Sequence, residues 1–230
     1  MKLFKKILYN IFFYSDLKIW IKMINFKKKD SSYNWESGVL DLYFLKKLIK
    51  IKNPKMVLEL GSGIGISSET ILDQITQEAK LVTVENNKNC INLCKSRLKK
   101  YKKNYEIIES EVIISKDKIN IETMIYKISK TIDFSNFDLI YIDGPSFTFD
   151  KDNKFISGIP RGDIFYLYDK IKIGTIIVLD GSKITRKQIY RFCKSIKFLG
   201  IYKSFSFYKT DNESLEDLTF TRLKKWQYIN

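Results

Sequence analysis

The sequence predicts an α/β fold built on a mostly parallel sheet, and three features support that prediction. Short apolar runs of strand length alternate with segments of helical spacing from residue 56 to residue 198. Three of the runs end in a glycine or an aspartate, which is typical of strands whose carboxyl ends meet at one ligand-binding edge. Two apolar segments near the carboxyl terminus, residues 202–208 and 218–223, are joined by a polar turn and predict an antiparallel hairpin.

The amino-acid composition narrows the chemistry open to the protein. At 230 residues with a 44% hydrophobic share, the chain is long enough for one domain with a sizeable core. Histidine is absent, so acid–base chemistry would come from Asp, Glu, Lys or Tyr. The three cysteines have no metal-like spacing, which indicates a reducing compartment and a cytoplasmic protein. Cys90 and Cys94 lie one helical turn apart, and we expect both to be core thiols.

Residues 1–32 form a predicted basic, amphipathic helical extension ahead of a domain at 33–230. The first 29 residues contain eight lysines against one acidic residue, Asp16, and contribute to a net charge of +15. Charged residues interrupt the apolar stripe too often for a membrane span, and no signal-peptidase site follows. Two interpretations stay open. The helices cap their own domain or pair with a second subunit as a homodimer, or they lie on the anionic inner face of a membrane as a peripheral contact.

The periodicity predicts the elements in order. The predicted helices are 33–51 (with Leu40, Phe44, Leu45, Leu48 and Ile49 in the core), 66–75, 89–100, 119–132, one starting at Asp163, and 185–198. The predicted parallel strands are 56–60, 81–84, 105–108, 137–142 and 174–179. A long loop of mixed charge, 146–161, precedes the helix at Asp163 and suits a lid or a substrate loop.

The stretch 56–68 is the most informative part of the chain. The predicted strand Met56–Leu60 runs into Gly61, Gly63 and Gly65, and a helix begins at Ile66. Such a turn leaves unpaired N–H groups and a helix dipole beside a surface without Cβ atoms, where a nucleotide-like ligand can approach closely. Ile66 stands where the dinucleotide fingerprint needs a third glycine or alanine, which disfavours NAD.

Carboxylates follow three other predicted strands. Glu85, followed by Asn86, ends the second strand, where an acidic residue accepts hydrogen bonds from ribose hydroxyls in related folds. Asp143 precedes a Gly-Pro turn, and Asp180 precedes Gly181. A carboxylate at this edge suits proton abstraction or metal binding. The simpler alternatives are an ordinary exposed Glu85 and an Asp143 that only caps a helix.

Glu59 followed by Gly61-Ser62-Gly63-Ile64-Gly65 resembles the first motif of the class I S-adenosylmethionine-dependent methyltransferases. The resemblance covers roughly residues 33–225 and implies a Rossmann-like seven-stranded sheet, mostly parallel, with a C-terminal antiparallel hairpin and helices on both faces. It implies S-adenosylmethionine as the cofactor. The implied cofactor contacts are Glu59, Gly61, Ser62, Gly63 and Gly65 around the methionine moiety, Glu85 and Asn86 at the ribose, Ser110 and Glu111 at the adenine, and Asp143 beside them.

Within this superfamily the chain is similar to two groups of O-methyltransferases. Residues 33–38 look like the lead-in of the catechol-type group, and Asp143 and Asp180 match two of that group's magnesium ligands. Where that group has a further Asn or Asp, this sequence has Gly181, so a divalent metal is possible but one ligand is missing. The Asp-Gly-Pro turn, with Arg161 ahead of the next helix, is also similar to sugar and polysaccharide O-methyltransferases, and we favour that resemblance.

The resemblance implies in-line methyl transfer to a hydroxyl of a small molecule or glycan. Since the cofactor is already activated, the protein would align the reactants and remove a proton. We expect Asp143 to be the base or its metal anchor and Asp180 to assist it. We expect Arg161 to bind an anionic substrate or to order the preceding loop.

Three other functions are alternatives to O-methylation. An RNA methyltransferase would use the basic surface, but its lysines are not interleaved with aromatics and no Asn-Pro-Pro-Tyr-like motif follows the fourth strand, so nucleic acid is a less favoured partner. A polyamine aminopropyltransferase would need more acidic residues around a cationic substrate. A catalytically inactive interaction protein would keep the fold and bind cofactor without turnover.

Overall fold

The computed structural model describes residues 39–145, 158–202 and 205–209. The predicted extension 1–32, most of the predicted loop 146–161 and the predicted strand 218–223 lie outside the described residues.

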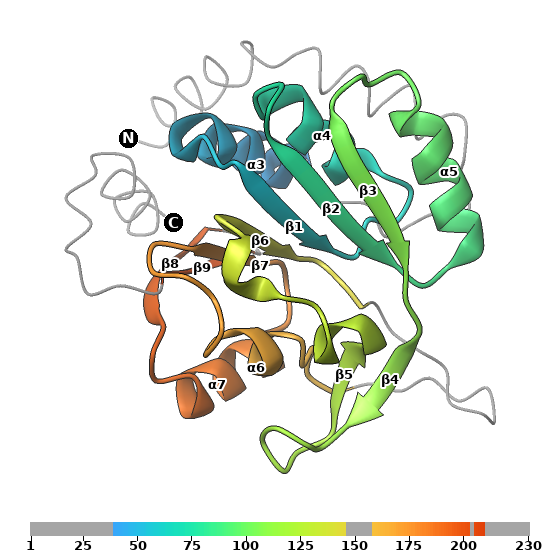
Figure 1. Ribbon diagram of the computed structural model, residues 1–230. Coiled ribbons are helices and arrows are strands. Elements are labelled where there is room, and N and C mark those ends of the chain that lie inside the picture. Colours follow the sequence, from blue (N-terminus) through green and yellow to red (C-terminus); the bar gives the residue numbers. More distant parts are fainter. Residues whose placement is uncertain (1–38, 146–157, 203–204, 210–230) are drawn as a thin grey trace, which may run out of the picture.

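A seven-stranded sheet in the order β3-β2-β1-β6-β7-β9-β8 forms the centre of the domain (Figure 1). The first five strands are parallel, and β9 runs antiparallel to both β7 and β8. This confirms the predicted mostly parallel sheet with an antiparallel hairpin. The strands are β1 (Met56–Leu60), β2 (Lys80–Glu85), β3 (Asn104–Glu109), β6 (Leu139–Ile142), β7 (Ile176–Leu179), β8 (Lys197–Tyr202) and β9 (Phe205–Lys209).

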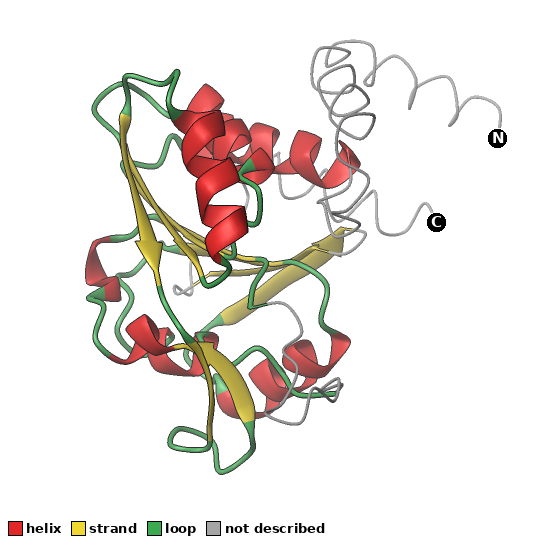
Figure 2. Cartoon of the chain, turned by 90° about the vertical axis from the view of Figure 1, so that its right-hand side faces the viewer, coloured by secondary structure: helices red, strands yellow, loops and turns green. Residues whose placement is uncertain are grey.

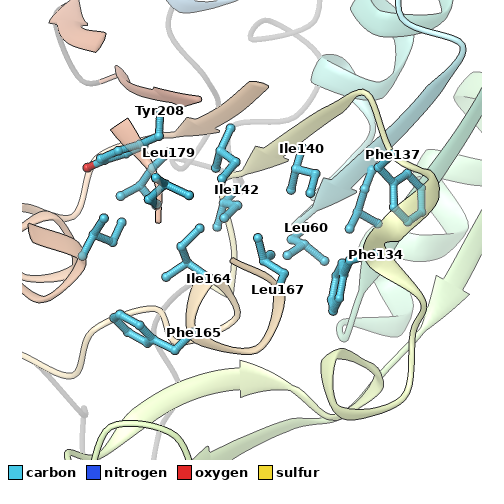
Figure 3. Close-up of a cluster of buried hydrophobic side chains, with 14 of the residues drawn as sticks. Leu60, Phe134, Phe137, Ile140, Ile142, Ile164, Phe165, Leu167, Leu179 and Tyr208 are labelled. Carbon is cyan, nitrogen blue, oxygen red and sulfur yellow. The ribbon is translucent and has the colours of Figure 1, made fainter. Parts of the chain in front are cut away.

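Helices cover both faces of the sheet (Figures 1 and 2). α3 (Val39–Lys52), α4 (Ile66–Gln74) and α5 (Lys88–Leu98) lie on one face, and α6 (Ile164–Leu167) and α7 (Lys183–Phe192) on the other. Because strand side chains alternate between faces, each face has its own core. Val57 and Tyr141 pack toward α3, α4 and α5, whereas Leu60, Ile142 and Leu179 pack toward α6 and α7 (Figure 3).

The predicted core of the first helix is largely confirmed. Phe44, Leu45, Leu48 and Ile49 are buried in α3, and Leu42 is buried with them; the side chain of Leu40 is outside the described set. Cys94 is fully buried and Cys90 half-buried, and burial raises the pKa of both thiols to about 11. Both are therefore neutral thiols, as expected of core cysteines.

The predicted helix at 119–132 is wrong. The chain instead forms a second, two-stranded antiparallel sheet from β4 (Val112–Ser115) and β5 (Thr123–Tyr126), followed by the 3-10 helices η1 (Lys127–Lys130) and η2 (Phe134–Asn136). All four residues of β5 are buried, so this strand reads as a continuous apolar run rather than an alternating one. The apolar residues around it happen to fall at helical spacing, which explains the error.

The hairpin differs from the predicted one. It is formed by β8 and β9, at 197–202 and 205–209, so the predicted strand 202–208 overlaps β9 and is its second strand, while the predicted strand 218–223 lies outside the described residues. The predicted helix 185–198 therefore ends early, since α7 stops at Phe192. Within the described residues, no helix is long and apolar enough to cross a membrane.

Candidate functional site

The glycine loop between β1 and α4 forms the first wall of the site. Gly61, Gly63 and Gly65 all have positive φ angles, of 98°, 50° and 86°. A Cβ on Gly61 would lie 2.5 Å from the backbone nitrogen of Gly144, and a Cβ on Gly65 would lie 2.8 Å from the sulfur of Cys94. At Gly63, by contrast, no atom lies within 4 Å of the Cβ position. Gly61 and Gly65 are therefore packing glycines, while Gly63 leaves space that a ligand can occupy.

Glu59 lies beneath this loop and not in it. Its side chain is fully buried, and one carboxylate oxygen accepts hydrogen bonds from the hydroxyls of Ser68 and Thr83. The other oxygen, Oε1, is buried without a partner in the described part of the chain. Burial raises the pKa of Glu59, although the hydroxyl hydrogen bonds oppose that shift. Glu59 thus links β1, β2 and α4 below the loop, and its contact with a cofactor stays a prediction.

Glu85, at the carboxyl end of β2, faces the loop directly. Oε2 accepts the N–H of Gly63 at 2.7 Å, and Oε1 accepts the N–H groups of Asn86 and Asn87 at 2.9 and 3.0 Å. An ionised carboxylate has about four lone-pair positions, so one position remains on Oε2. Glu85 is therefore held rigidly beside Gly63, with room for one hydroxyl rather than for the two that the ribose role would use.

The residues predicted to contact adenine lie at the end of β3. Ser110 is buried, and its hydroxyl already accepts the N–H of Ile128 at 3.0 Å. The backbone N–H of Ser110 binds the carbonyl of Glu85 at 2.9 Å, which places it next to the predicted ribose position. Glu111 is exposed and forms an ion pair with Lys127 at 3.1 Å. Asn86 follows Glu85 at the end of β2, and Ser62, which is 4% exposed, directly precedes Gly63 in the loop after β1. The adenine and ribose contacts remain predictions.

Asp143 and Asp180 come together at the ends of β6 and β7. The strands pair in the register Ile142 to Leu179, so the next residue of each strand is an aspartate at the same level. The Tyr141 hydroxyl lies 3.2 Å from Oδ2 of Asp143 and 3.5 Å from Oδ2 of Asp180. The N–H of Asp143 also binds the carbonyl of Leu60 at 2.9 Å, which places Asp143 beside the end of β1. The expected approach of Asp143 to the glycine loop is thus seen in the structure.

Arg161 completes this cluster. Its Nη1 donates to the backbone carbonyl of Asp180 at 2.5 Å, and its Nη2 lies 3.9 Å from Oδ1 of Asp143. The side chains of Arg161 and Asp143 are only 16% and 25% exposed, so water screens the pair weakly. From the sequence, Arg161 is expected to bind an anionic substrate or to order the preceding loop, and both roles stay predictions. The sequence did not predict that the guanidinium lies beside the Asp143 carboxylate and binds the backbone carbonyl of Asp180.

The small sheet holds Arg161 in place. Met124 of β5 donates its N–H to Pro160 and accepts the N–H of Gly162, at 2.9 and 2.8 Å, so residues 160–162 run alongside β5 like a third strand. A Cβ on Gly162 would lie 2.3 Å from Oγ1 of Thr123, so only glycine allows this approach. The Arg161 N–H binds the Thr185 hydroxyl at 2.8 Å, which ties the same segment to α7.

Asp163 is a buried acid that sequence reasoning did not select. It is fully buried, its Oδ1 accepts the N–H of Tyr126 at 2.9 Å and the hydroxyl of Ser129 at 2.6 Å, and its Oδ2 is buried without a partner in the described residues. Burial raises the pKa of Asp163 to about 7, although these hydrogen bonds and the charge of Arg161 oppose the shift. The carboxyl group therefore changes charge near neutral pH.

We expect Asp163→Asn to alter how stability depends on pH. The folded protein holds the Asp163 proton more tightly than the unfolded chain, whose value is near 3.8. The contribution of this group to stability is therefore fully present below pH ~4 and is lost as the pH rises through ~7. Relative to the wild type, the variant should gain on the order of 1 kcal/mol per pH unit across that window. Urea unfolding at pH 5, 6, 7 and 8 measures this; parallel curves for the two proteins would contradict it. The exposed Asp169, changed to Asn, serves as control.

Tyr126 is the second residue that the sequence did not reveal, because its strand was read as helix. Its hydroxyl lies 2.5 Å from the position that a Cβ on Gly144 would take, so it reaches the junction of Gly61 and Gly144. Burial raises its pKa well above the ordinary value, and the negative charges of Glu85, Asp163 and Asp143 add to the shift. Tyr126 is therefore a neutral phenol at the junction of Gly61 and Gly144.

The residues do not fit a divalent metal of the catechol type. Asp143 and Asp180 are close, but Gly181 offers no side-chain oxygen, and the Arg161 guanidinium lies 3.9 Å from the Asp143 carboxylate and binds the backbone carbonyl of Asp180. Among the residues that the structure describes, no group of three or more acidic or cysteine side chains could hold a metal ion.

Solved structures share this fold. A Staphylococcus aureus protein assigned as a caffeoyl-CoA O-methyltransferase matches with a TM-score of 0.60 and 17% identity over 91% of this chain and 100% of its own. A Podospora anserina methyltransferase bound to SAH (0.57, 16%, covering 84% and 88%) and a Bacillus cereus O-methyltransferase in complex with SAH (0.55, 15%, covering 83% and 88%) match similarly. At these identities the likeness shows the fold alone.

Sequence comparison identifies the family. No curated protein matches the chain. The family model described as O-methyltransferase matches residues 17–198, which is most of the chain. Together with the strand order and the carboxylates at the strand ends, this match shows that the chain belongs to the O-methyltransferase family, a group of class I S-adenosylmethionine-dependent methyltransferases.

Proposed function

We propose that this protein binds S-adenosylmethionine between the glycine loop and Glu85 and methylates a hydroxyl of a small molecule or sugar without a divalent metal. The observation that carries the proposal is the arrangement at four adjacent strand ends, those of β2, β1, β6 and β7. There, an open Cβ position at Gly63 faces the fixed Glu85, and Asp143 lies one strand away with Arg161 and Asp180.

The residues fit the cofactor in two respects. Gly63 lets a ligand approach the backbone, and Glu85 keeps one lone-pair position for a ribose hydroxyl. Two of the similar solved structures are bound to SAH, the product of this cofactor, which supports the same site in this chain. When bound, S-adenosylmethionine supplies an activated methyl group on a sulfonium centre.

The chain's own residues would then handle the proton and the charge. Asp143 accepts the proton of the acceptor hydroxyl, because its carboxylate lies at the sheet edge next to the loop. The Tyr141 hydroxyl of β6 lies within hydrogen-bond distance of both carboxylates, so this hydroxyl and Asp180 orient Asp143. Arg161 has N–H groups beyond the one bound to Asp180, and these can bind the acceptor oxygen as it becomes negative.

Glu85→Gln tests the cofactor site. The amide places an NH₂ group against backbone N–H donors and loses the charge, so S-adenosylmethionine affinity should fall about 10- to 100-fold by calorimetry. Glu109→Gln is the matched control, because Glu109 pairs with Glu85 in register at the end of β3 and is exposed. Equal affinity losses in the two variants, or none in Glu85→Gln, would remove Glu85 from the cofactor site.

A further inference from the structure

Asp143 and Asp180, at the ends of β6 and β7, bring two carboxylates to the same place at the edge of the sheet. Two carboxylates that meet at a partly buried edge repel each other, and a cation beside them relieves that repulsion. Among the described residues, the guanidinium of Arg161 supplies a positive charge there, with Nη2 at 3.9 Å from the Asp143 carboxylate and Nη1 at 2.5 Å from the backbone carbonyl of Asp180.

The guanidinium and a divalent cation would compete for the same place. A cation bound to Oδ1 of Asp143 at the ~2.1 Å typical of magnesium would lie no more than about 6 Å from Nη2 of Arg161. Two positive charges at that distance in a weakly solvated site repel strongly. Gly181 adds no oxygen ligand, and its positive φ of 65° with open space at the Cβ position leaves a gap where a ligand side chain could stand.

The fold holds the guanidinium too firmly for a metal to displace it easily. Residues 160–162 are bonded to Met124 on one side, and the Arg161 N–H is bonded to Thr185 on the other. Asp163, two residues after Arg161, accepts hydrogen bonds from the Tyr126 N–H and the Ser129 hydroxyl. Three separate elements, β5, η1 and α7, therefore fix the backbone from which the Arg161 side chain extends.

We infer that Arg161 is a built-in cation that takes the place of a divalent metal at the Asp143–Asp180 pair, so that the site excludes magnesium and manganese and presents guanidinium N–H groups to the acceptor oxygen. The part about the acceptor rests on the proposed function; the exclusion of the metal does not. Unlike a bound metal ion, the guanidinium is covalently part of the chain and cannot be removed by a chelator.

The test is a manganese titration of the full chain, followed by electron paramagnetic resonance and by calorimetry. The wild type should show no saturable site below millimolar Mn²⁺. The double variant R161Q/G181N loses the guanidinium charge and gains an amide oxygen next to Asp180, and it should bind Mn²⁺ at least about tenfold more tightly than the wild type. G181N alone should not, because Arg161 is still present.

Two controls separate the inference from general effects. Arg191→Ala removes one positive charge from the exposed face of α7 and should leave Mn²⁺ binding as in the wild type. S-adenosylmethionine binding, measured on every variant, reports both folding and the proposed function independently of the metal.

Either of two results would overturn the inference. One is a saturable submillimolar Mn²⁺ site in the wild type that Asp143→Asn abolishes, and this result needs no variant of Arg161 to fold. The other is an R161Q/G181N protein that binds S-adenosylmethionine normally yet gains no Mn²⁺ affinity over G181N.

Discussion

Asp143→Asn should lower turnover by about two orders of magnitude or more while S-adenosylmethionine affinity changes little. A positioned general base contributes roughly 10²- to 10⁴-fold, and an amide of the same shape cannot accept the proton. Cofactor affinity should be kept because the Asp143 N–H, which holds the end of β6 to Leu60, is unchanged. The measurement is kcat on the best hydroxyl acceptor from a panel of catechols, sugars and sugar acids, with cofactor affinity by calorimetry.

The matched control for this variant is Asp169→Asn, which removes the same charge at an exposed position just after α6. It should leave kcat unchanged within about twofold. Unchanged turnover in Asp143→Asn would exclude Asp143 from the chemistry. A large loss of cofactor affinity without a loss of kcat would make Asp143 a cofactor-binding residue instead.

Gly61→Ala and Gly63→Ala should have different effects, mainly on stability for Gly61 and mainly on cofactor affinity for Gly63, although the two glycines lie two residues apart in one loop. A Cβ at Gly61 would meet the backbone of Gly144 at 2.5 and 2.6 Å, and the φ of 98° is itself unfavourable for alanine. Backbone atoms cannot move aside as a flexible side chain can, so the ends of β1 and β6 would have to separate. We expect the free energy of unfolding to fall by about 3 kcal/mol or more.

Gly63→Ala meets no atom within 4 Å, so its cost is the positive φ alone, roughly 1 kcal/mol. The added methyl group would instead occupy the space beside Glu85, and S-adenosylmethionine affinity should fall. Urea unfolding and calorimetry on both variants separate the two effects. A Gly61→Ala protein as stable as Gly63→Ala would show that the loop does not pack against Gly144 as described.

The sequence predicted the parallel sheet well because its strands are buried on both faces and read as short apolar runs. Met56–Leu60 and Leu139–Ile142 are examples, and the carboxylates that follow such strands necessarily meet at one edge. The second sheet was missed for a physical reason. Its strands have only four residues each, and the segment 160–162 that pairs with β5 lies far away in sequence. Local periodicity therefore could not indicate the second sheet.

The sequence predicted the carboxylates at the strand ends of the site, but not the residues that other elements bring next to them. Glu85, Asp143 and Asp180 could be placed from the ends of strands. The position of Arg161 depends on β5 and α7, and those of Tyr126 and Asp163 depend on the burial of a segment read as helix. Long-range packing decides such positions, and a single sequence does not encode it in any short pattern.

The predicted extension 1–32 stays a prediction, with its homodimer and membrane alternatives open. Comparing full-length protein with a chain that starts at residue 33, by liposome sedimentation and by light scattering, would distinguish them. Equal sedimentation with anionic vesicles would exclude membrane docking by this segment.

A calorimetric titration of the wild-type protein with S-adenosylmethionine in the presence of EDTA tests the central claim most directly. We expect saturable micromolar binding that magnesium does not change, because Gly63 and Glu85 are proposed to form the cofactor site and Arg161 supplies a local positive charge. Absence of binding up to millimolar cofactor, in protein shown to be folded, would contradict the proposed function and leave residues 61–65 as a tight turn only.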